Sequence, residues 1–212
     1  MIHWKKLLNI AYEILNEANI PLTEWTFGGG TALSYFYNHR ESKDIDIFFH
    51  SAQILTYVSP RLNSKAEKVS ENYTEQSNFI KLYIQNQEID FIVAPNLTGI
   101  SPKLVKIEGM ELYIDDPVEI IAKKLFYRPE SIKVRDIIDT VVVYTNNENL
   151  TKILKEKKIT IKSSLIKKRL EIIKSSPDLQ KVLKNLNLKI TDFSFEEYIN
   201  IFERFTGEVE NG

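Results

Sequence analysis

The residues best suited to chemistry in this sequence are aspartates in short apolar runs. Asp44 and Asp46 stand one residue apart at the start of the run IDIFF, and Asp90 lies within EIDFIVA. Side chains at positions i and i+2 of a strand project from the same face, about 6–7 Å apart along the chain. Acids in an otherwise apolar strand are costly unless they bind something. Taken alone, Asp44 and Asp46 could instead lie on the solvent face of an edge strand.

A carboxylate pair of this kind suits Mg²⁺, which usually takes one or two protein carboxylates together with substrate phosphates. A third carboxylate would let two metal ions sit about 4 Å apart, where they activate an attacking hydroxyl and stabilise a leaving oxygen. Asp90 is the candidate for this third ligand, and Glu88, on the same face of its strand, is the alternative. The sequence therefore predicts a Mg²⁺ site built from Asp44, Asp46 and Asp90.

Three consecutive glycines, residues 28–30, precede this acidic segment, and the chain has only seven glycines in total. Glycine lacks a Cβ atom, so it concentrates where the backbone turns tightly or approaches a ligand closely. Backbone N–H groups of Gly29, Gly30 and Thr31, at the start of a helix, would favour a phosphate anion. A plain turn is the alternative explanation of the glycines alone.

The spacing of apolar residues predicts the elements that must position these groups. Strands are expected over residues 25–27, 45–49, 78–84 and 88–94, with two short pieces within 103–114. Helices are expected over residues 3–19, 31–37, 116–127, 134–144, 150–157, 162–175, 178–186 and 194–205. This order predicts an α/β fold in which a mixed sheet is flanked by helices and is followed by an all-helical C-terminal portion. We expect an α/β domain over residues 1–114 and a helical domain over residues 115–212.

Composition narrows the cellular context of the protein. The 212-residue chain contains no cysteine, which excludes disulfides and thiolate metal sites and favours a reducing cytoplasm. The first 20 residues predict an amphipathic helix rather than a signal peptide, because Glu13, Asn16 and Glu17 interrupt the apolar positions. No uncharged apolar segment approaches about 18 residues, so we expect no membrane span.

Charge is distributed unevenly along the chain. Residues 1–148 carry 15 Lys and Arg against 20 Asp and Glu, residues 149–189 carry 12 against 3, and residues 190–212 carry 1 against 6. A basic block in an otherwise acidic chain suggests a polyanionic partner such as RNA, and Lys167, Lys168 and Arg169 are its densest point. A solvated lysine-rich helical face is the alternative.

The chain resembles the AbiEii/AbiGii-type nucleotidyltransferase toxin family, within the DNA polymerase β-like nucleotidyltransferase superfamily, in two ordered motifs. The first is carried by Gly29-Gly30-Thr31-Ala32-Leu33 and His39-Arg40-x-Ser42-x-Asp44-Ile45-Asp46-Ile47-Phe48. The second, helical motif is carried by Ala122-Lys123-Lys124-Leu125-x-x-Arg128 and Arg135-Asp136-x-x-Asp139. Tyr127 and Thr140 depart from that second motif, where the family has a small or aliphatic residue and a leucine. The resemblance covers roughly residues 25–145 and implies a nucleotidyltransferase-type mixed sheet.

The resemblance implies a Mg²⁺-dependent enzyme that transfers a nucleotide from a nucleoside triphosphate (NTP) to an acceptor hydroxyl. Studied relatives use the tRNA 3′ end and are neutralised by an antitoxin, so tRNA or another RNA and an antitoxin protein are the expected partners. By position, the resemblance implies that the triphosphate is contacted by Gly29, Gly30 and Thr31. It implies that Mg²⁺ is bound by Asp44, Asp46 and Asp90. Asp90 would also be a base for the attacking hydroxyl. Lys124 would neutralise triphosphate charge, Arg40 would brace the aspartates or touch the phosphate, and Asp136 and Asp139 would orient Lys124 or the nucleotide.

Several alternatives stay open on the sequence alone. Lys124 could be a surface lysine, with Lys123 as the functional residue, and Asp139 could merely pair with Arg135 along a helix. Asp90 could pair with Arg40. At the level of function, the acceptor could be a small molecule of the antibiotic type, or the fold could be a catalytically silent binding module.

Overall fold

A computed structural model describes residues 2–190 and 192–210 of the chain. The residues group into two compact units. Unit 1 comprises Met1–Ala32, Ser42–Asn96 and Ser101–Asp116, and unit 2 comprises Leu33–Glu41, Leu97–Ile100 and Pro117–Gly212. The division into folding domains at residues 114 and 115 stays a prediction.

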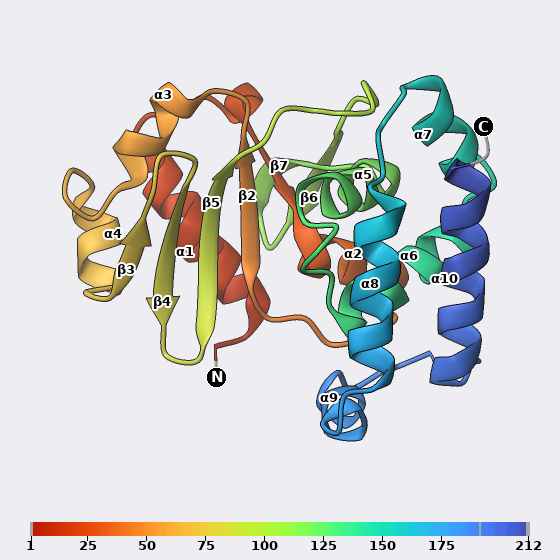
Figure 1. The fold of residues 1–212 in the computed structure, drawn as a ribbon. Helices are drawn as coiled ribbons and strands as arrows, with labels where there is room; N and C mark the ends of the chain where they lie inside the picture. Colours follow the sequence, from red (N-terminus) through yellow and green to blue (C-terminus); the bar gives the residue numbers. More distant parts are fainter. Residues whose placement is uncertain (1, 191, 211–212) are drawn as a thin grey trace. The chain divides into compact units, whose positions relative to one another are not determined.

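Unit 1 is built on a seven-stranded mixed sheet with the strand order β3-β4-β5-β2-β1-β7-β6 (Figure 1). The strands are β1 (Trp25–Gly28), β2 (Ile45–Phe49), β3 (Tyr73–Glu75), β4 (Phe79–Ile84), β5 (Gln87–Val93), β6 (Lys103–Ile107) and β7 (Met110–Ile114). β2 pairs with β5 in parallel and β1 pairs with β7 in parallel, while the remaining neighbours are antiparallel. Because β2 lies between β5 and β1, the alternative that Asp44 and Asp46 mark an edge strand is wrong.

The two faces of this sheet differ because side chains alternate along each strand. Ile47 on β2 and Phe91 on β5 are fully buried, and Phe27 on β1 stacks on Trp4 at a ring distance of 6.2 Å. Trp4 begins helix α1 (Trp4–Glu17), whose leucines and Ile14 are buried. The opposite face carries the polar side chains of the same strands, so the sheet presents its acids away from α1.

Short helical segments complete unit 1. They are the 3₁₀ turns η1 (Leu22–Glu24) and η2 (Thr56–Val58) and the helices α3 (Ala52–Leu55) and α4 (Ser64–Val69). Helix α2 (Gly29–Tyr37) starts directly after β1 and contains residues of both units. It begins two residues earlier than expected, so Gly29 and Gly30 belong to its first turn rather than to a separate loop.

The regular secondary structure described for unit 2 consists of helices and one isolated β-bridge, between Arg40 and Leu188. Its helices after residue 116 are α5 (Pro117–Tyr127), α6 (Val134–Asn146), α7 (Leu150–Glu156), α8 (Ser163–Lys174), α9 (Leu179–Asn185) and α10 (Phe195–Glu210). Helix α10 packs on α6, α7 and α8 and buries Tyr198, Phe202 and Phe205. The predicted α/β class with a helical C-terminal portion is therefore confirmed. Among residues 2–190 and 192–210, none of the helices has the length and apolar composition that crossing a membrane requires.

Candidate active site

Asp46 on β2 and Asp90 on β5 lie side by side. They are directly paired in the parallel register of the two strands, so both side chains project from the same face of the sheet. The Asp90 side chain is 17% exposed, and its Oδ1 atom has no hydrogen-bond partner among the described residues. Burial and the neighbouring charge of Asp46 together raise the pKa of Asp90 to about 7. Burial and the proximity of Asp46 therefore disfavour the ionised form of Asp90.

Lys81 on β4 is the cationic partner of this pair. It lies opposite Asp90 in the antiparallel register, and its Nζ atom is 3.0 Å from Oδ2 of Asp90. The same ammonium group also pairs with Glu88, the alternative metal ligand. Lys81 opposes the rise in the pKa of Asp90, but burial and Asp46 outweigh it. Asp90 thus pairs with Lys81.

Gly29 makes room for the Asp46 carboxylate. Gly28 is the register partner of Asp46 in the β1–β2 pair, and Gly29 follows it at a φ of +69°, which glycine adopts readily. A Cβ atom at position 29 would fall 1.8 Å from Oδ2 of Asp46. The glycine is therefore required both for the backbone turn into α2 and for the close approach of the carboxylate.

Asp44 is held just before β2 by residues from two other segments. The Thr31 hydroxyl, buried in α2, donates to the backbone carbonyl of Asp44 at 2.5 Å. The backbone N–H of Glu88 donates to Oδ1 of Asp44 at 3.2 Å. The Thr31 side chain therefore fixes the chain that leads into β2, and only its backbone N–H would remain for the predicted phosphate contact.

The carboxylates of Asp46 and Asp90 fit a divalent cation in part. Within the described part of the chain, no group of three or more His, Asp or Glu side chains is arranged to hold a metal ion. The Asp46–Asp90 pair nevertheless offers hard oxygen ligands, a mutual repulsion that a cation would relieve, and the unpartnered Oδ1 of Asp90. Asp44 as a third ligand stays a prediction.

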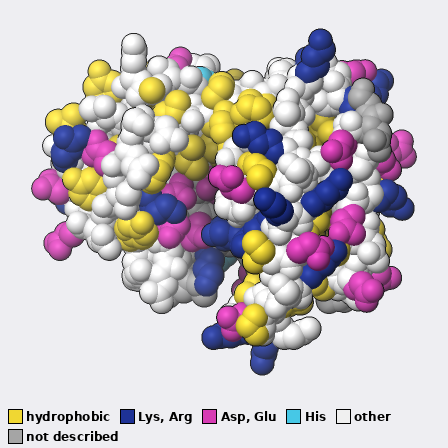
Figure 2. All heavy atoms as spheres, viewed as in Figure 1, with side chains coloured by type: hydrophobic (Ala, Val, Ile, Leu, Met, Phe, Trp, Pro, Cys, Tyr) yellow, Lys and Arg dark blue, Asp and Glu magenta, His cyan; other side chains and the backbone are white. Residues whose placement is uncertain are grey.

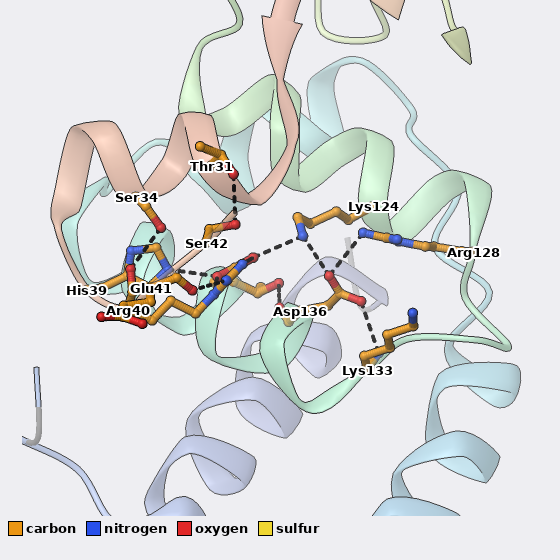
Figure 3. A network of polar contacts seen from close by, with 12 residues as sticks. Thr31, Ser34, His39, Arg40, Glu41, Ser42, Lys124, Arg128, Lys133 and Asp136 are labelled. Carbon is orange, nitrogen blue, oxygen red and sulfur yellow. Dashed lines mark hydrogen bonds and ion pairs between the residues drawn. The ribbon is translucent and has the colours of Figure 1, made fainter. Parts of the chain in front are cut away.

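Unit 2 holds a second cluster of predicted residues, centred on Lys124. This lysine of α5 lies between two acids of α6, with Nζ 2.6 Å from Oδ1 of Asp136 and 2.9 Å from Oδ2 of Asp139 (Figure 3). The Lys124 side chain is only 5% exposed, so the alternative of a surface lysine is wrong. The acids are one helical turn apart, which places both on the side of α6 that faces α5.

Asp139 is shared by three basic side chains. Arg40 binds both of its oxygens, with Nε 2.7 Å from Oδ1 and a terminal nitrogen 2.9 Å from Oδ2, and Nε2 of His39 is 2.7 Å from Oδ1. Burial alone would raise the pKa of Asp139, but Lys124 and Arg40 hold this pKa well below its usual range. Within unit 2, Arg40 therefore binds Asp139, and its expected role toward the metal-binding aspartates or the phosphate stays a prediction.

Asp136 links Lys124 to Arg128. A terminal nitrogen of Arg128 lies 3.0 Å from Oδ1 of Asp136, and the backbone N–H of Lys133 donates to Oδ2 (Figure 3). Burial opposes ionisation, but Lys124 and Arg128 lower the pKa of Asp136 below its ordinary value. Besides His39, the network contains the cations Lys124, Arg40 and Arg128 and the carboxylates Asp136 and Asp139. The Arg128 side chain is 35% exposed, so this cation reaches solvent.

Lys123, the alternative to Lys124, occupies a different environment on the same helix. Its side chain is 4% exposed and its Nζ atom lies 3.6 Å from Oε1 of Glu119. The Glu119 carboxylate also accepts from the backbone N–H groups of Leu97 and Thr98. Both lysines are thus buried, and each has an acidic partner of its own.

The basic block is partly neutralised by helix α10. Nζ of Lys167 lies 3.2 Å from Glu210, and Nζ of Lys174 lies 2.7 Å from Glu203. On the face of unit 2 seen in Figure 2, Lys and Arg side chains are interspersed with Asp and Glu side chains. Lys168 is exposed on α8 beside these pairs. The local surface is therefore less basic than the sequence count suggests.

Three functional candidates were not expected from the sequence. The sequence patterns assign no role to Lys81, and they include His39 and Arg128 only as parts of the two motifs. The signal for Lys81 is its alternation with buried residues along β4, which puts it on the polar face of the sheet. His39 and Arg40 reach Asp139 across about 100 residues of sequence, a contact that spacing cannot reveal.

Comparisons with known proteins agree with the resemblance. A family profile described as "Nucleotidyl transferase AbiEii toxin, Type IV TA system" matches residues 14–197. The nucleotidyltransferase toxin MenT4 (Rv2826c) from Mycobacterium tuberculosis H37Rv is similar in structure, with a TM-score of 0.51 and 13% identity over 98% of this chain and 84% of that chain. ANT(2″)-Ia, solved in complex with adenylyl-2″-tobramycin, has a TM-score of 0.52 and 16% identity over 73% of this chain and 96% of that chain.

At these identities the two structures show a shared fold. A search of curated protein sequences gives no match. The family profile, in contrast, spans most of the 212 residues. The chain is a nucleotidyltransferase and belongs to the AbiEii nucleotidyltransferase toxin family.

Proposed function

We propose that the protein is a Mg²⁺-dependent toxin that transfers a nucleotide from an NTP to the 3′-terminal hydroxyl of a tRNA, and that a partner antitoxin neutralises it in the cytoplasm. The observation that carries the proposal is the register pairing of Asp46 and Asp90 on adjacent parallel strands, with Gly29 against the Asp46 carboxylate. This arrangement leaves two acids on one face of the sheet next to a helix start.

The acids would hold the metal and the helix start would hold the phosphates. Asp46 and Asp90, with Asp44 as a third ligand, would bind Mg²⁺, which when bound supplies positive charge to the triphosphate. The backbone N–H groups of Gly29, Gly30 and Thr31 would donate to phosphate oxygens at the N-terminus of α2. The Asp46 carboxylate keeps its place because no Cβ atom at position 29 competes with it.

Asp90 would also act as the general base. In the metal-free protein the pKa of Asp90, about 7, leaves the group partly ionised near neutral pH, and in the ionised form it can accept a proton. In the proposed step, the Asp90 carboxylate takes the proton of the acceptor hydroxyl and the acceptor oxygen forms a bond to the α-phosphorus. The bond from the α-phosphorus to its bridging oxygen breaks, and pyrophosphate leaves.

Lys124 would supply positive charge to the triphosphate, in the role that the resemblance implies for it. Asp136 and Asp139 fix the position of its ammonium group, and Arg40 and His39 fix Asp139 in turn. Fixed charges of this kind lower the barrier to phosphoryl transfer because they need no reorganisation during the reaction. Arg128, at the exposed end of the same network, would extend the positive potential toward solvent.

An RNA acceptor is favoured by the basic block of residues 149–189, which keeps an exposed lysine, Lys168, on α8 although Lys167 and Lys174 pair with α10. The competing candidate is a small-molecule acceptor, which would not need this surface. A catalytically silent fold is disfavoured, because Asp46 and Asp90 occupy an interior part of the sheet at a cost that a binding module need not bear.

Incubation of the full chain with each labelled NTP, Mg²⁺ and total tRNA tests the proposal. We expect label on tRNA with the wild-type protein and none with Asp46→Ala, although both bind nucleotide and unfold cooperatively. Label that appears only on an added aminoglycoside would instead support the small-molecule acceptor. Nucleotide binding without transfer to either acceptor would contradict the enzyme mechanism.

A further inference from the structure

Lys81 holds one of the two carboxylate oxygens of Asp90. Its Nζ atom lies 3.0 Å from Oδ2 of Asp90, and β4 keeps the two residues directly opposite one another. The Lys81 side chain is 23% exposed, so its long stem is enclosed while its ammonium group reaches the acids. A positive charge therefore already occupies one side of the Asp46–Asp90 pair.

Glu88 gives this ammonium group a second partner. Glu88 and Asp90 are two residues apart on β5 and project from the same face, and Lys81 pairs with both. The Glu88 side chain is the more exposed of the two acids, at 37% against 17%. Lys81 could therefore leave Asp90 without becoming an unpaired charge, because Glu88 would still hold it.

We propose that Lys81 is a built-in counterion of the candidate metal site, which balances Asp46 and Asp90 in the metal-free protein and competes with the divalent cation for Asp90, with Glu88 retaining Lys81 once the cation binds. This inference rests on the proposed function, since it assumes that Asp46 and Asp90 bind the metal. It assigns Lys81 a positioning role toward Asp90.

The competition follows from elementary electrostatics. A divalent cation beside Asp90 would stand within several ångströms of the Lys81 ammonium group, and two positive charges repel at that range even when solvent screens them strongly. Without the cation, the Lys81 charge offsets the repulsion between the two carboxylates, and its loss would leave Asp90 without its ion-pair partner. The same lysine therefore stabilises the metal-free protein and weakens metal binding.

Calorimetric titration of the full chain with Mn²⁺, at mildly alkaline pH so that Asp90 is ionised, tests this role directly. Lys81→Met removes the charge and keeps the stem, and we expect it to bind Mn²⁺ about tenfold more tightly than the wild type. Lys81→Arg keeps the charge and should stay within about twofold. Lys106→Met, at an exposed lysine on the far strand β6, is the matched control and should have no effect.

Two further measurements complete the test. In EDTA, Lys81→Met should melt at a lower temperature than the wild type, and Mg²⁺ should raise its melting temperature by more than it raises that of the wild type. Glu88→Gln should weaken Mn²⁺ binding in the wild type and have a smaller effect in the Lys81→Met background, because Glu88 acts by retaining Lys81.

The outcomes separate this inference from the proposed function. If the wild type binds Mn²⁺, Asp46→Ala does not, and Lys81→Met binds with wild-type affinity, the role of Lys81 is overturned and the metal site stands. If wild type and Asp46→Ala both fail to bind Mn²⁺ in the presence and absence of NTP, the proposed metal site and the role of Lys81 are both overturned.

Discussion

The Asp46 carboxylate lies against the backbone of Gly29, where a Cβ atom would come within 1.8 Å of Oδ2. Gly29→Ala should therefore displace the carboxylate or the start of α2. We expect a loss of about 2–4 kcal/mol in the free energy of unfolding, from the positive φ and the clash together, and a fall of about a hundredfold in transfer activity. Urea unfolding and single-turnover transfer assays measure the two effects.

Gly109→Ala provides the control for this substitution. Gly109 also has a positive φ, of +88°, but a Cβ atom there would meet nothing within 4 Å. Gly109→Ala should lower the free energy of unfolding by about 1–2 kcal/mol, because of the backbone conformation alone, and should leave activity unchanged. In an Asp46→Ala background, Gly29→Ala should cost less than it does beside Asp46, because only the contact with the Cβ atom of residue 46, at 2.8 Å, remains. A cost that is undiminished in that background would show that Asp46 is not what requires the glycine.

Substitution of the two buried lysines of α5 separates a structural role from a chemical one. In Lys124→Met, Asp136 keeps its ion pair with Arg128 and Asp139 keeps its ion pair with Arg40. In Lys123→Met, the Glu119 carboxylate still accepts hydrogen bonds from two backbone N–H groups. Each variant should therefore lose about 1–3 kcal/mol of stability. Only Lys124→Met should lower the rate of transfer, by about a hundredfold or more, because only Lys124 is proposed to act on the triphosphate.

The same assays decide between the lysines in either direction. Urea unfolding checks that the two stability losses are comparable, and the transfer rate under saturating NTP isolates the chemical effect. Loss of activity in Lys123→Met with retention in Lys124→Met would move the proposed role to Lys123. Lys152→Gln, at an exposed lysine of α7, serves as the control for a general effect of lost charge.

Much of this arrangement could be predicted from the sequence, because it depends on local patterns. Alternation predicts the strands that carry Asp46 and Asp90, and the order Asp116, Pro117, Glu119 predicts the start of α5. Strand register could not be predicted, and only register places Lys81 opposite Asp90. The contact of His39 with Asp139 and the neutralisation of α8 by α10 likewise depend on packing between distant segments.

The raised pKa of Asp90 predicts how the stability of the metal-free protein depends on pH. The unfolded chain ionises Asp near pH 3.9, whereas the folded protein keeps Asp90 protonated up to about pH 7. Between these values the folded state binds more protons, so the free energy of unfolding falls as pH rises through the window. The loss is at most about 4 kcal/mol, since one pKa unit corresponds to about 1.4 kcal/mol.

Urea unfolding in EDTA across this pH window measures the effect. Other groups titrate in the same range, so the wild type is compared with Asp90→Asn. In Asp90→Asn the free energy of unfolding should fall less steeply with rising pH than in the wild type. Mg²⁺ should restore the lost stability above neutral pH, where Asp90 is ionised, and should do little below pH 5. An identical pH slope in wild type and Asp90→Asn would contradict the raised pKa.

The pairing of α8 with α10 gives a test of the RNA surface that does not depend on activity. Glu210→Gln releases Lys167 from its ion pair, whereas Lys168→Gln removes an exposed charge from the same helix. If the lysines of α8 contact RNA phosphates, Glu210→Gln should strengthen tRNA binding about twofold to fivefold and Lys168→Gln should weaken it by a similar factor. Binding titrations at several salt concentrations should also give a shallower salt dependence for Lys168→Gln, because fewer counterions are released.

Lys65→Gln, at an exposed lysine of unit 1 that pairs with Glu13, is the control and should change neither the affinity for tRNA nor its salt dependence. Equal affinities of all three variants and the wild type would show that α8 is a solvated helical face and that any RNA acceptor is bound elsewhere.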